Sequence, residues 1–156
     1  MRNNIVLNEP LSRHTSWKVG GPADIFFTPN DRNDLSDFLK SNDCIITWLG
    51  NGTNILVRDA GVRGAVISTR KSLNKIELID QSNYLVEVGV SCFELAMYAT
   101  KNNFGPAAFF SGIPGSIGGA LTMNAGCFGN ETWEFVKSVE VMDRNGEIHQ
   151  LDPEEF

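Results

Sequence analysis

The sequence predicts an α+β protein whose two lobes meet near residues 70–75. In the first part of the chain, apolar strand-like runs alternate with a helical pattern, which favours parallel strands joined by a right-handed crossover. In the second part, strand-like runs come in pairs around short turns, which is typical of hairpins. We assign residues 1–72 to the first lobe and residues 73–156 to the second.

The first lobe is expected to contain several short strands and one helix. Leu35, Phe38 and Leu39 recur at helical spacing behind Asp31, which predicts a helix over 32–41 with Asp31 as its N-cap. Short apolar runs bounded by turn residues predict strands at 23–27, 45–49, 55–57 and 65–68.

The second lobe is expected to combine two hairpins with helices. Ser91 and Glu94 have the spacing of a capping box, which predicts a helix of about 92–103. Asn145-Gly146 is a strong turn pair, and residues 153–156 resemble the opening of a further helix. Strands are expected at 75–79, 84–89, 136–142 and 147–151.

Composition excludes several classes of function. The net charge of -6 argues against nucleic-acid binding, which requires basic patches. No apolar run is suited to a signal peptide or to a membrane span, so we expect a cytoplasmic protein with no membrane partner. The cysteines and histidines show neither a disulfide framework nor a metal-ligand spacing, so no metal site is predicted: they are Cys44, Cys92, Cys127, His14 and His149.

A first glycine-rich loop directly follows a predicted strand. Consecutive N–H groups in such a loop form a concavity that binds anions, and the sequence suits a pyrophosphate. It is neither the Gly-x-Gly-x-x-Gly fingerprint nor a P-loop, and a plain hairpin turn is an equally open alternative. The candidate cofactor-binding residues are Gly50, Asn51, Gly52, Thr53 and Asn54.

A second glycine-rich segment is expected to enter a short helix at Ser116, with free N–H groups that attract phosphate. Gly118 and Gly119 would let a ring system approach the backbone, and Asn124 could bond the edge of a heterocycle. The alternative is a helix packed tightly through small residues. Two such loops in two lobes suggest a clamped dinucleotide. The candidates here are Ile113, Pro114, Gly115, Ser116, Gly118, Gly119, Ala120, Thr122, Asn124, Ala125 and Gly126.

Some conspicuous residues are expected to have structural roles. We interpret His14 as making a structural hydrogen bond, and Cys127 as a small packed side chain. Glu131 and Glu134 are expected as helix-start or surface charges. The tryptophans are expected in the core or at the lobe interface: Trp17, Trp48 and Trp133.

An ordered set of motifs closely resembles the UDP-N-acetylenolpyruvoylglucosamine reductase (MurB) family across essentially the whole chain. The motifs are Pro10-Leu11-Ser12-x-His14-Thr15, Val19-Gly20-Gly21-Pro22-Ala23, residues 49–57, residues 113–120 and residues 124–131. The resemblance implies a two-subdomain FAD-binding domain of the vanillyl-alcohol-oxidase (PCMH-type) kind. By position, the first loop matches the family's FAD pyrophosphate loop, and residues 113–126 match the segment that lines the cofactor.

The resemblance also implies a bacterial role in peptidoglycan precursor synthesis, in which NADPH reduces the flavin and the flavin reduces an enolpyruvyl UDP-sugar. The family's Tyr-Arg-x-x-Ser motif is expected just after Phe156, so no residue here matches a catalytic position. We expect the second subdomain to be incomplete and this chain alone to lack turnover. UDP-sugar binding would need the missing part, and exposed lobe surface could favour self-association. The alternatives are a noncatalytic flavin-binding module or part of another oxidoreductase of this cofactor fold.

Overall fold

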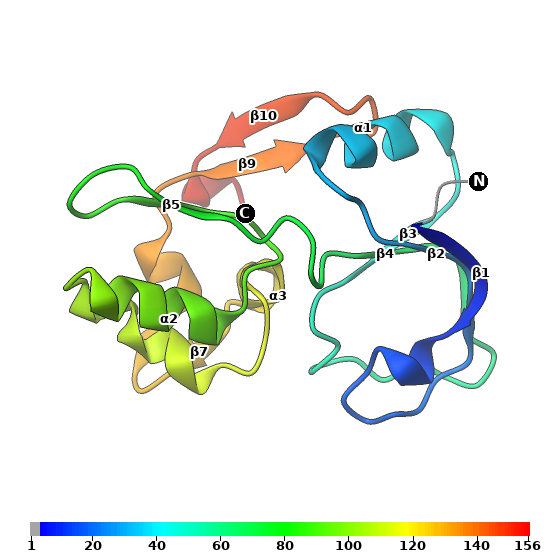
Figure 1. Ribbon diagram of the computed structural model, residues 1–156, viewed down its shortest axis with the longest axis horizontal. Coiled ribbons are helices and arrows are strands. Elements are labelled where there is room, and N and C mark those ends of the chain that lie inside the picture. Colours follow the sequence, from blue (N-terminus) through cyan, green and yellow to red (C-terminus); the bar gives the residue numbers. More distant parts are fainter. Residues whose placement is uncertain (1–3) are drawn as a thin grey trace.

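Two lobes stand side by side in the computed structural model, which describes residues 4–156 (Figure 1). The first three residues of the predicted first lobe therefore lie outside the described residues. The first lobe is built on a mixed sheet and one helix. Its elements are β1 (Ile5–Pro10), β2 (Pro22–Phe27), α1 (Arg32–Ser41), β3 (Ile46–Leu49) and β4 (Val62–Ser68), with a 3-10 turn at Leu11–Arg13.

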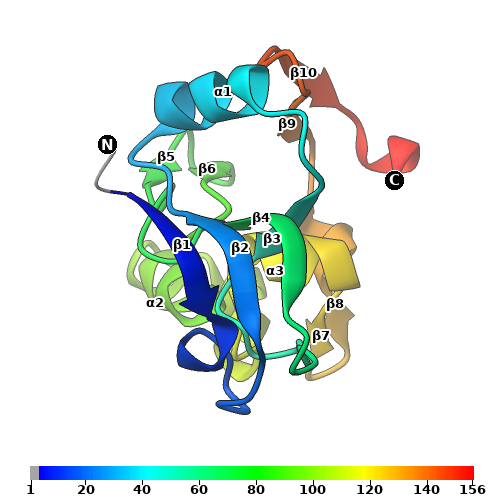
Figure 2. The ribbon, with the colours of Figure 1, turned by 90° about the vertical axis from the view of Figure 1, so that its right-hand side faces the viewer.

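The four strands lie in the order β1-β2-β4-β3 (Figure 2). The predicted parallel pairing is confirmed, but β2 and β3 each pair with β4, which lies between them. β1 adds to the edge antiparallel to β2 and was not predicted. Because β2, β3 and β4 run in parallel, their carboxyl ends lie at the same end of the sheet. The 50–54 loop follows the carboxyl end of β3.

The helix over 32–41 is confirmed, and the side chain of Asp31 accepts a hydrogen bond from the Asp34 N–H at 2.8 Å. The predicted strand at 55–57 is wrong, because these residues form no strand pairing within residues 4–156. Val57 is instead buried in an apolar cluster with Leu11, and the Arg58 carbonyl accepts the Gly21 N–H. The apolar run thus reflects burial of a connecting segment.

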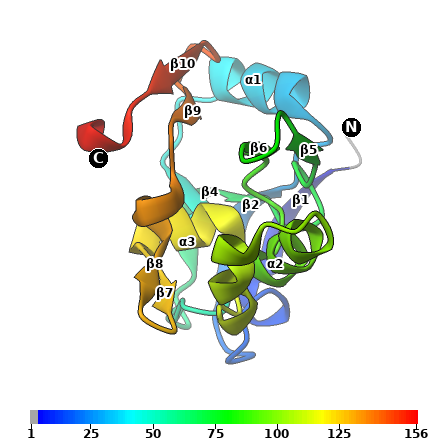
Figure 3. The same cartoon turned by 90° about the vertical axis from the view of Figure 1, so that its left-hand side faces the viewer.

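The second lobe packs two helices against short hairpins (Figure 3). The capping box is confirmed: the Glu94 N–H donates to Ser91 Oγ at 3.1 Å, and the Ser91 N–H donates to Glu94 Oε2 at 3.0 Å. The helices and strands are β5 (Ile76–Leu78), β6 (Tyr84–Val86), α2 (Cys92–Lys101), α3 (Ile117–Met123), β7 (Gly126–Cys127), β8 (Asn130–Glu131), β9 (Val139–Met142) and β10 (Ile148–Leu151). The 3-10 segments are Gly105–Gly112, Thr132–Phe135 and Pro153–Glu155, the last lying where a helix opening was expected.

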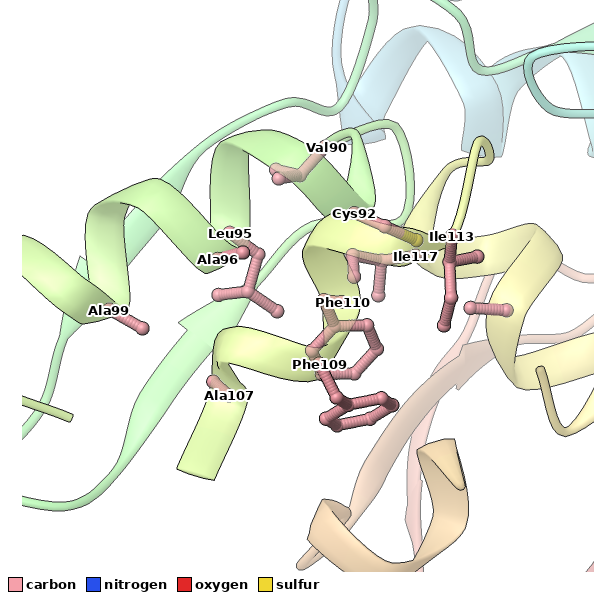
Figure 4. Packing of buried hydrophobic residues seen from close by; sticks show 11 residues of the cluster. Val90, Cys92, Leu95, Ala96, Ala99, Ala107, Phe109, Phe110, Ile113 and Ile117 are labelled. Atoms are coloured by element: carbon pink, nitrogen blue, oxygen red, sulfur yellow. The ribbon is translucent and has the colours of Figure 1, made fainter. Parts of the chain in front are cut away.

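The second lobe has an apolar core of its own, whereas the cluster around α1 also takes in Leu73. The second-lobe cluster lies between α2, the 105–112 segment and α3, and includes Leu95, Phe110 and Ile117 (Figure 4). In the first lobe, alternate residues of the strands point to opposite faces of the sheet. Phe27 therefore packs with α1 on one face, whereas Phe26 packs beneath the connecting loops on the other.

The β9–β10 hairpin reaches back from the second lobe and lies against α1 of the first (Figure 1). Arg32 on α1 contacts Glu140 on β9 at 2.7 Å and Glu87 at 3.5 Å. Ser36 Oγ donates to the Gly146 carbonyl at 3.2 Å, and Arg144 donates to the Cys44 carbonyl at 3.1 Å. The division at residue 72 stays a prediction, since this hairpin contacts the other lobe.

Of the tryptophans expected in the core or at the lobe interface, Trp17 and Trp48 are not core residues, and their place at the interface stays a prediction. Trp17 is 68% exposed and Trp48 is 52% exposed, whereas Trp133 is partly buried and donates its indole N–H to the Leu121 carbonyl at 3.0 Å. Within residues 4–156, none of the helices has both the length and the apolar character that crossing a bilayer requires.

Candidate functional site

The two predicted glycine-rich segments approach each other from the two lobes. A Cβ atom on Gly50 would overlap Ser116 Oγ. A Cβ atom on Gly115 would lie 3.8 Å from Thr53 Oγ1, an ordinary contact distance. Residues that are more than sixty positions apart in the sequence thus form one surface, as a clamp between the lobes requires.

The loop after β3 has an unusual hydrogen-bonding state. Among residues 4–156, none accepts a hydrogen bond from the N–H groups of residues 50–56. Gly52 is nevertheless buried, and Gly50, Asn51 and Thr53 are partly buried. Because buried backbone donors are nearly always paired, this run of free N–H groups requires water or a ligand as acceptor. Several consecutive donors of this kind form an anion-binding concavity.

The segment that begins α3 has the opposite state. The N–H groups of Ile117 and Gly118 donate to the Val90 and Val88 carbonyls at 2.8 and 2.9 Å. The Gly119 N–H donates to the N-cap side chain of Ser116 at 3.3 Å. The prediction of free N–H groups at this helix start is therefore wrong, because the chain before α2 already accepts them.

The glycines of the second segment divide into two kinds. A Cβ on Gly118 would lie 3.0 Å from Val88 Cβ, and one on Gly126 would lie 2.8 Å from the Asn130 carbonyl oxygen. Tight packing between protein segments explains these two. The nearest neighbours of a Cβ on Gly115 or Gly119 would be 3.8 and 3.6 Å away, so protein packing does not require glycine there. These two positions are the candidates for close approach of a ligand.

Asn124 ends α3 in the left-handed conformation with φ 44°. Its side-chain amide donates to Glu131 at 2.7 Å and accepts the Trp133 N–H at 3.2 Å. The amide N–H and the amide oxygen of Asn124, which were predicted to bond a heterocycle edge, therefore hydrogen-bond the segment that follows α3. Glu131 and Glu134 form a capping box at 132–135, which confirms their expected helix-start role.

The remaining predicted residues lie in three environments. Ile113 (Figure 4) is buried in the second-lobe core, and so is Ala120. Ala125 is partly buried, and its carbonyl accepts the Thr132 hydroxyl at 2.6 Å. The exposed members are Asn54, Pro114 and Thr122, of which Thr122 donates its hydroxyl to the Gly118 carbonyl at 2.8 Å.

Residues 14–16 support the first loop, a contact that the sequence analysis did not predict. The Ser16 N–H donates to the Gly52 carbonyl at 2.9 Å, and a Cβ on Gly52 would overlap the His14 carbonyl oxygen. The structural hydrogen bond expected for His14 is confirmed, with Glu9 at 2.9 Å as its partner. No local pattern indicated this contact, because Glu9 lies on the unpredicted β1.

Two surface hollows lie on other parts of the molecule. One, of about 500 Å³, lies beside Lys40 and Arg144. The other, of about 620 Å³, lies beside Phe109 and Phe128. A separate group at the β9–β10 turn has side-chain N and O atoms within 4.8 Å of one another and was not singled out in the sequence. It comprises the partly buried Asp143 and the exposed Glu147 and His149.

Known proteins resemble this chain in sequence and in structure. Residues 23–152 match the family described as an FAD binding domain. Reductases named UDP-N-acetylenolpyruvoylglucosamine reductase are 44% identical over 157 residues in Legionella pneumophila strain Paris and 46% identical over 151 residues in Methylococcus capsulatus. The alignments cover 99% and 96% of this chain but 52% and 50% of those proteins, so the chain spans about half their length.

The structural likenesses agree with the sequence matches. The crystal structure of the Thermus caldophilus reductase of the same name superposes with a TM-score of 0.79 at 32% identity, over 99% of this chain and 54% of that one. An alkyldihydroxyacetonephosphate synthase superposes with a TM-score of 0.68 at 16% identity, over 97% of this chain and 32% of that one, which shows the fold alone. The predicted α+β fold of the vanillyl-alcohol-oxidase kind is confirmed.

Proposed function

This chain belongs to the FAD-binding domain family, and we propose that it holds FAD between its two glycine-rich segments. The observation that carries the proposal is the run of N–H groups at 50–56 that donate to no acceptor within residues 4–156. A diphosphate supplies several acceptor oxygens and negative charge, which such a run of donors stabilises.

The residues present fit an anionic dinucleotide. The chain carries a net charge of -6, yet neither residues 50–57 nor residues 113–126 contain an Asp or a Glu. The anion would therefore meet backbone dipoles and hydroxyl groups without a carboxylate in either segment. Thr53 adds a hydroxyl beside Gly115, where the segments approach.

We assign the two segments different tasks. Residues 50–54 would hold the diphosphate, because their N–H groups have no acceptor in the described part of the chain. Residues 113–120, 122 and 124–126 would line the rest of the cofactor, with Gly115 and Gly119 allowing the closest approach. The buried members Ile113 and Ala120 would support this wall from the core. When bound, FAD supplies two-electron redox chemistry at this surface.

The names of the relatives suggest the reaction of the whole protein. We propose that the chain provides the cofactor-binding part for NADPH-dependent reduction of UDP-N-acetylglucosamine enolpyruvate in peptidoglycan precursor synthesis. Because the chain spans about half the length of these relatives, we propose that the purified chain binds FAD without turnover.

Titration of the flavin-free chain with FAD tests the cofactor proposal. Saturable quenching of flavin fluorescence, confirmed by calorimetry, is the expected result. Gly115→Ala should weaken binding about tenfold if the ring system lies against this backbone, whereas Gly105→Ala is a matched control because no atom lies within 4 Å of its added Cβ. A folded chain that does not bind FAD would contradict the proposal.

Turnover is tested separately. NADPH oxidation is followed in the presence of FAD and the enolpyruvyl UDP-sugar, with a full-length relative as the positive control. No rate above background is expected from the 156 residues. Measurable turnover would contradict the expected lack of catalysis but would leave FAD binding intact.

A further inference from the structure

The segment that supports the first loop consists of residues 14–16, here called the strap. The Gly52 carbonyl accepts the Ser16 N–H at 2.9 Å, which fixes the peptide group between Gly52 and Thr53. In a trans peptide the C=O and N–H bonds point in opposite directions. The Thr53 N–H therefore points away from the strap, and it has no acceptor within residues 4–156.

Gly52 gives the strap little freedom to move relative to the loop. Its φ of 67° lies in the left-handed region, and its Cα lies so close to His14 that an added Cβ would overlap the carbonyl oxygen. A shift of the strap would therefore turn or displace the Gly52 peptide. The direction of the Thr53 donor depends on where the strap is held.

The strap is anchored by the His14 side chain. Its Nε2 lies 2.9 Å from Glu9 Oε1, and its ring stacks on Phe26 with centroids 4.1 Å apart. Glu9 belongs to β1, and Phe26 is a buried residue of β2. Arg13 approaches the second Glu9 oxygen at 3.6 Å and is 69% exposed. The anchor thus ties the strap to the rigid sheet.

We propose that Glu9 and His14 are positioning residues for the cofactor: by holding the strap against Gly52, they aim the N–H donors of the 50–56 loop at the diphosphate. This inference rests on the proposed function, because it assigns a task to groups behind the same site. Neither side chain needs to contact FAD for the effect to occur.

His14→Phe is the test variant, because it keeps a ring on Phe26 and removes the hydrogen bond to Glu9. The FAD dissociation constant should rise about tenfold. This corresponds to about 1.4 kcal/mol, which is the net contribution of roughly one hydrogen bond. Glu9→Gln should remain within about threefold of the wild type, because an amide can still bond the imidazole. Arg13→Gln is the matched control and should change nothing, since it removes only an exposed contact with Glu9.

Hydrogen exchange in the FAD-saturated protein separates positioning from a general loss of structure. In His14→Phe, the protection that FAD confers on residues 50–56 should fall, while the protection of residues 117–120 stays at the wild-type level. Equal loss of protection in both segments would overturn the inference, as would an unchanged FAD dissociation constant.

The positioning role of His14 and Glu9 can fail separately from FAD binding itself. If His14→Phe does not fold, Glu9→Leu removes the same hydrogen bond from the other side and is judged by the same two measurements. If the wild-type chain binds no FAD, the proposed function fails first. If the wild type binds and both variants bind equally well, only the positioning role of Glu9 and His14 fails.

Discussion

The loop at 50–56 and the segment at 113–120 share glycine-rich sequences but differ in what their backbones bind. In the first, no N–H group has an acceptor within residues 4–156. In the second, the first turn of α3 donates to Val88, Val90 and Ser116. Glycine composition therefore marks a close approach without showing whether protein or ligand is approached.

The glycines differ in their physical roles as well. Gly52 is required by a left-handed φ of 67° and by the neighbouring strap. Gly118 is required by contact with Val88, whereas Gly115 and Gly119 have room around them. We infer that the first loop supplies polar recognition and the second a close-packed wall with two open positions.

The largest effect is expected from Gly52→Ala. The added Cβ would overlap backbone of the strap, and alanine is strained at this φ, so the free energy of unfolding should fall by about 2–4 kcal/mol. Gly119→Ala should leave it unchanged or raise it by up to about 1 kcal/mol, because its Cβ has an ordinary contact distance and alanine favours a helix more than glycine does. Urea titrations of both variants measure the difference; equal stabilities would show that the contrast between the segments is wrong.

FAD should protect the two segments unequally from hydrogen exchange. The amides of residues 50–56 have no acceptor among residues 4–156, so they should exchange rapidly without FAD and slowly with it. Amides of residues 117–119 are already bonded within the protein and should change little. Mass spectrometry of peptic peptides gives both values in one sample. Strong new protection at 117–119 with none at 50–56 would reverse our assignment of the diphosphate.

Much of the fold was predictable because local signals were strong. The helix at 32–41, the capping box of α2 and the β9–β10 hairpin each depend on residues close in sequence. The insertion of β4 between β2 and β3 was not predictable, because strand order depends on which distant edges meet. The apolar run at 55–57 was predicted as a strand, although Val57 is apolar because it is buried in a connecting segment. Local sequence alone does not separate these two cases.

The candidate site was predictable in its residue types and only partly in its chemistry. Strand, glycine and hydroxyl patterns located both segments. The N–H groups of Ile117 and Gly118 were mistaken for free groups, because their acceptors lie about thirty residues earlier in the sequence. The strap was missed for the same reason: Glu9 and Phe26 are brought to His14 only by the sheet.

A smaller effect is expected from Ser116→Ala. Ser116 is buried, accepts the Gly119 N–H and caps α3, so its loss should cost about 1 kcal/mol in thermal or urea unfolding. Ser91→Ala at the cap of α2 is the matched control with a similar expected cost. Because a Cβ on Gly50 would overlap Ser116 Oγ, only Ser116→Ala should also weaken FAD binding. Equal FAD affinity in both variants would show that the segments meet without affecting the cofactor.

The smallest effect of FAD is expected on the thiol reactivity of Cys92, which contacts the second segment through its backbone N–H. Burial raises the pKa of its thiol to about 11, and its N–H donates to the Gly115 carbonyl at 2.9 Å. At pH 8 it should therefore react with a thiol reagent far more slowly than the partly exposed Cys44 and Cys127, as followed by mass spectrometry.

The Cys92 thiol also determines how the free energy of unfolding changes with pH. Because the folded-state pKa lies above the ordinary value of 9.0, the unfolded thiol loses its proton first as pH rises. The stability associated with the neutral buried thiol is complete below pH 9 and is lost as pH rises toward 11, and Cys92→Ala should remove this component. FAD should leave the rate of Cys92 labelling at pH 8 unchanged, because the neighbouring Gly115 is already hydrogen-bonded to Cys92 within the protein. If FAD slowed the labelling markedly, the second segment would be as open without cofactor as the first, and the contrast between them would fail.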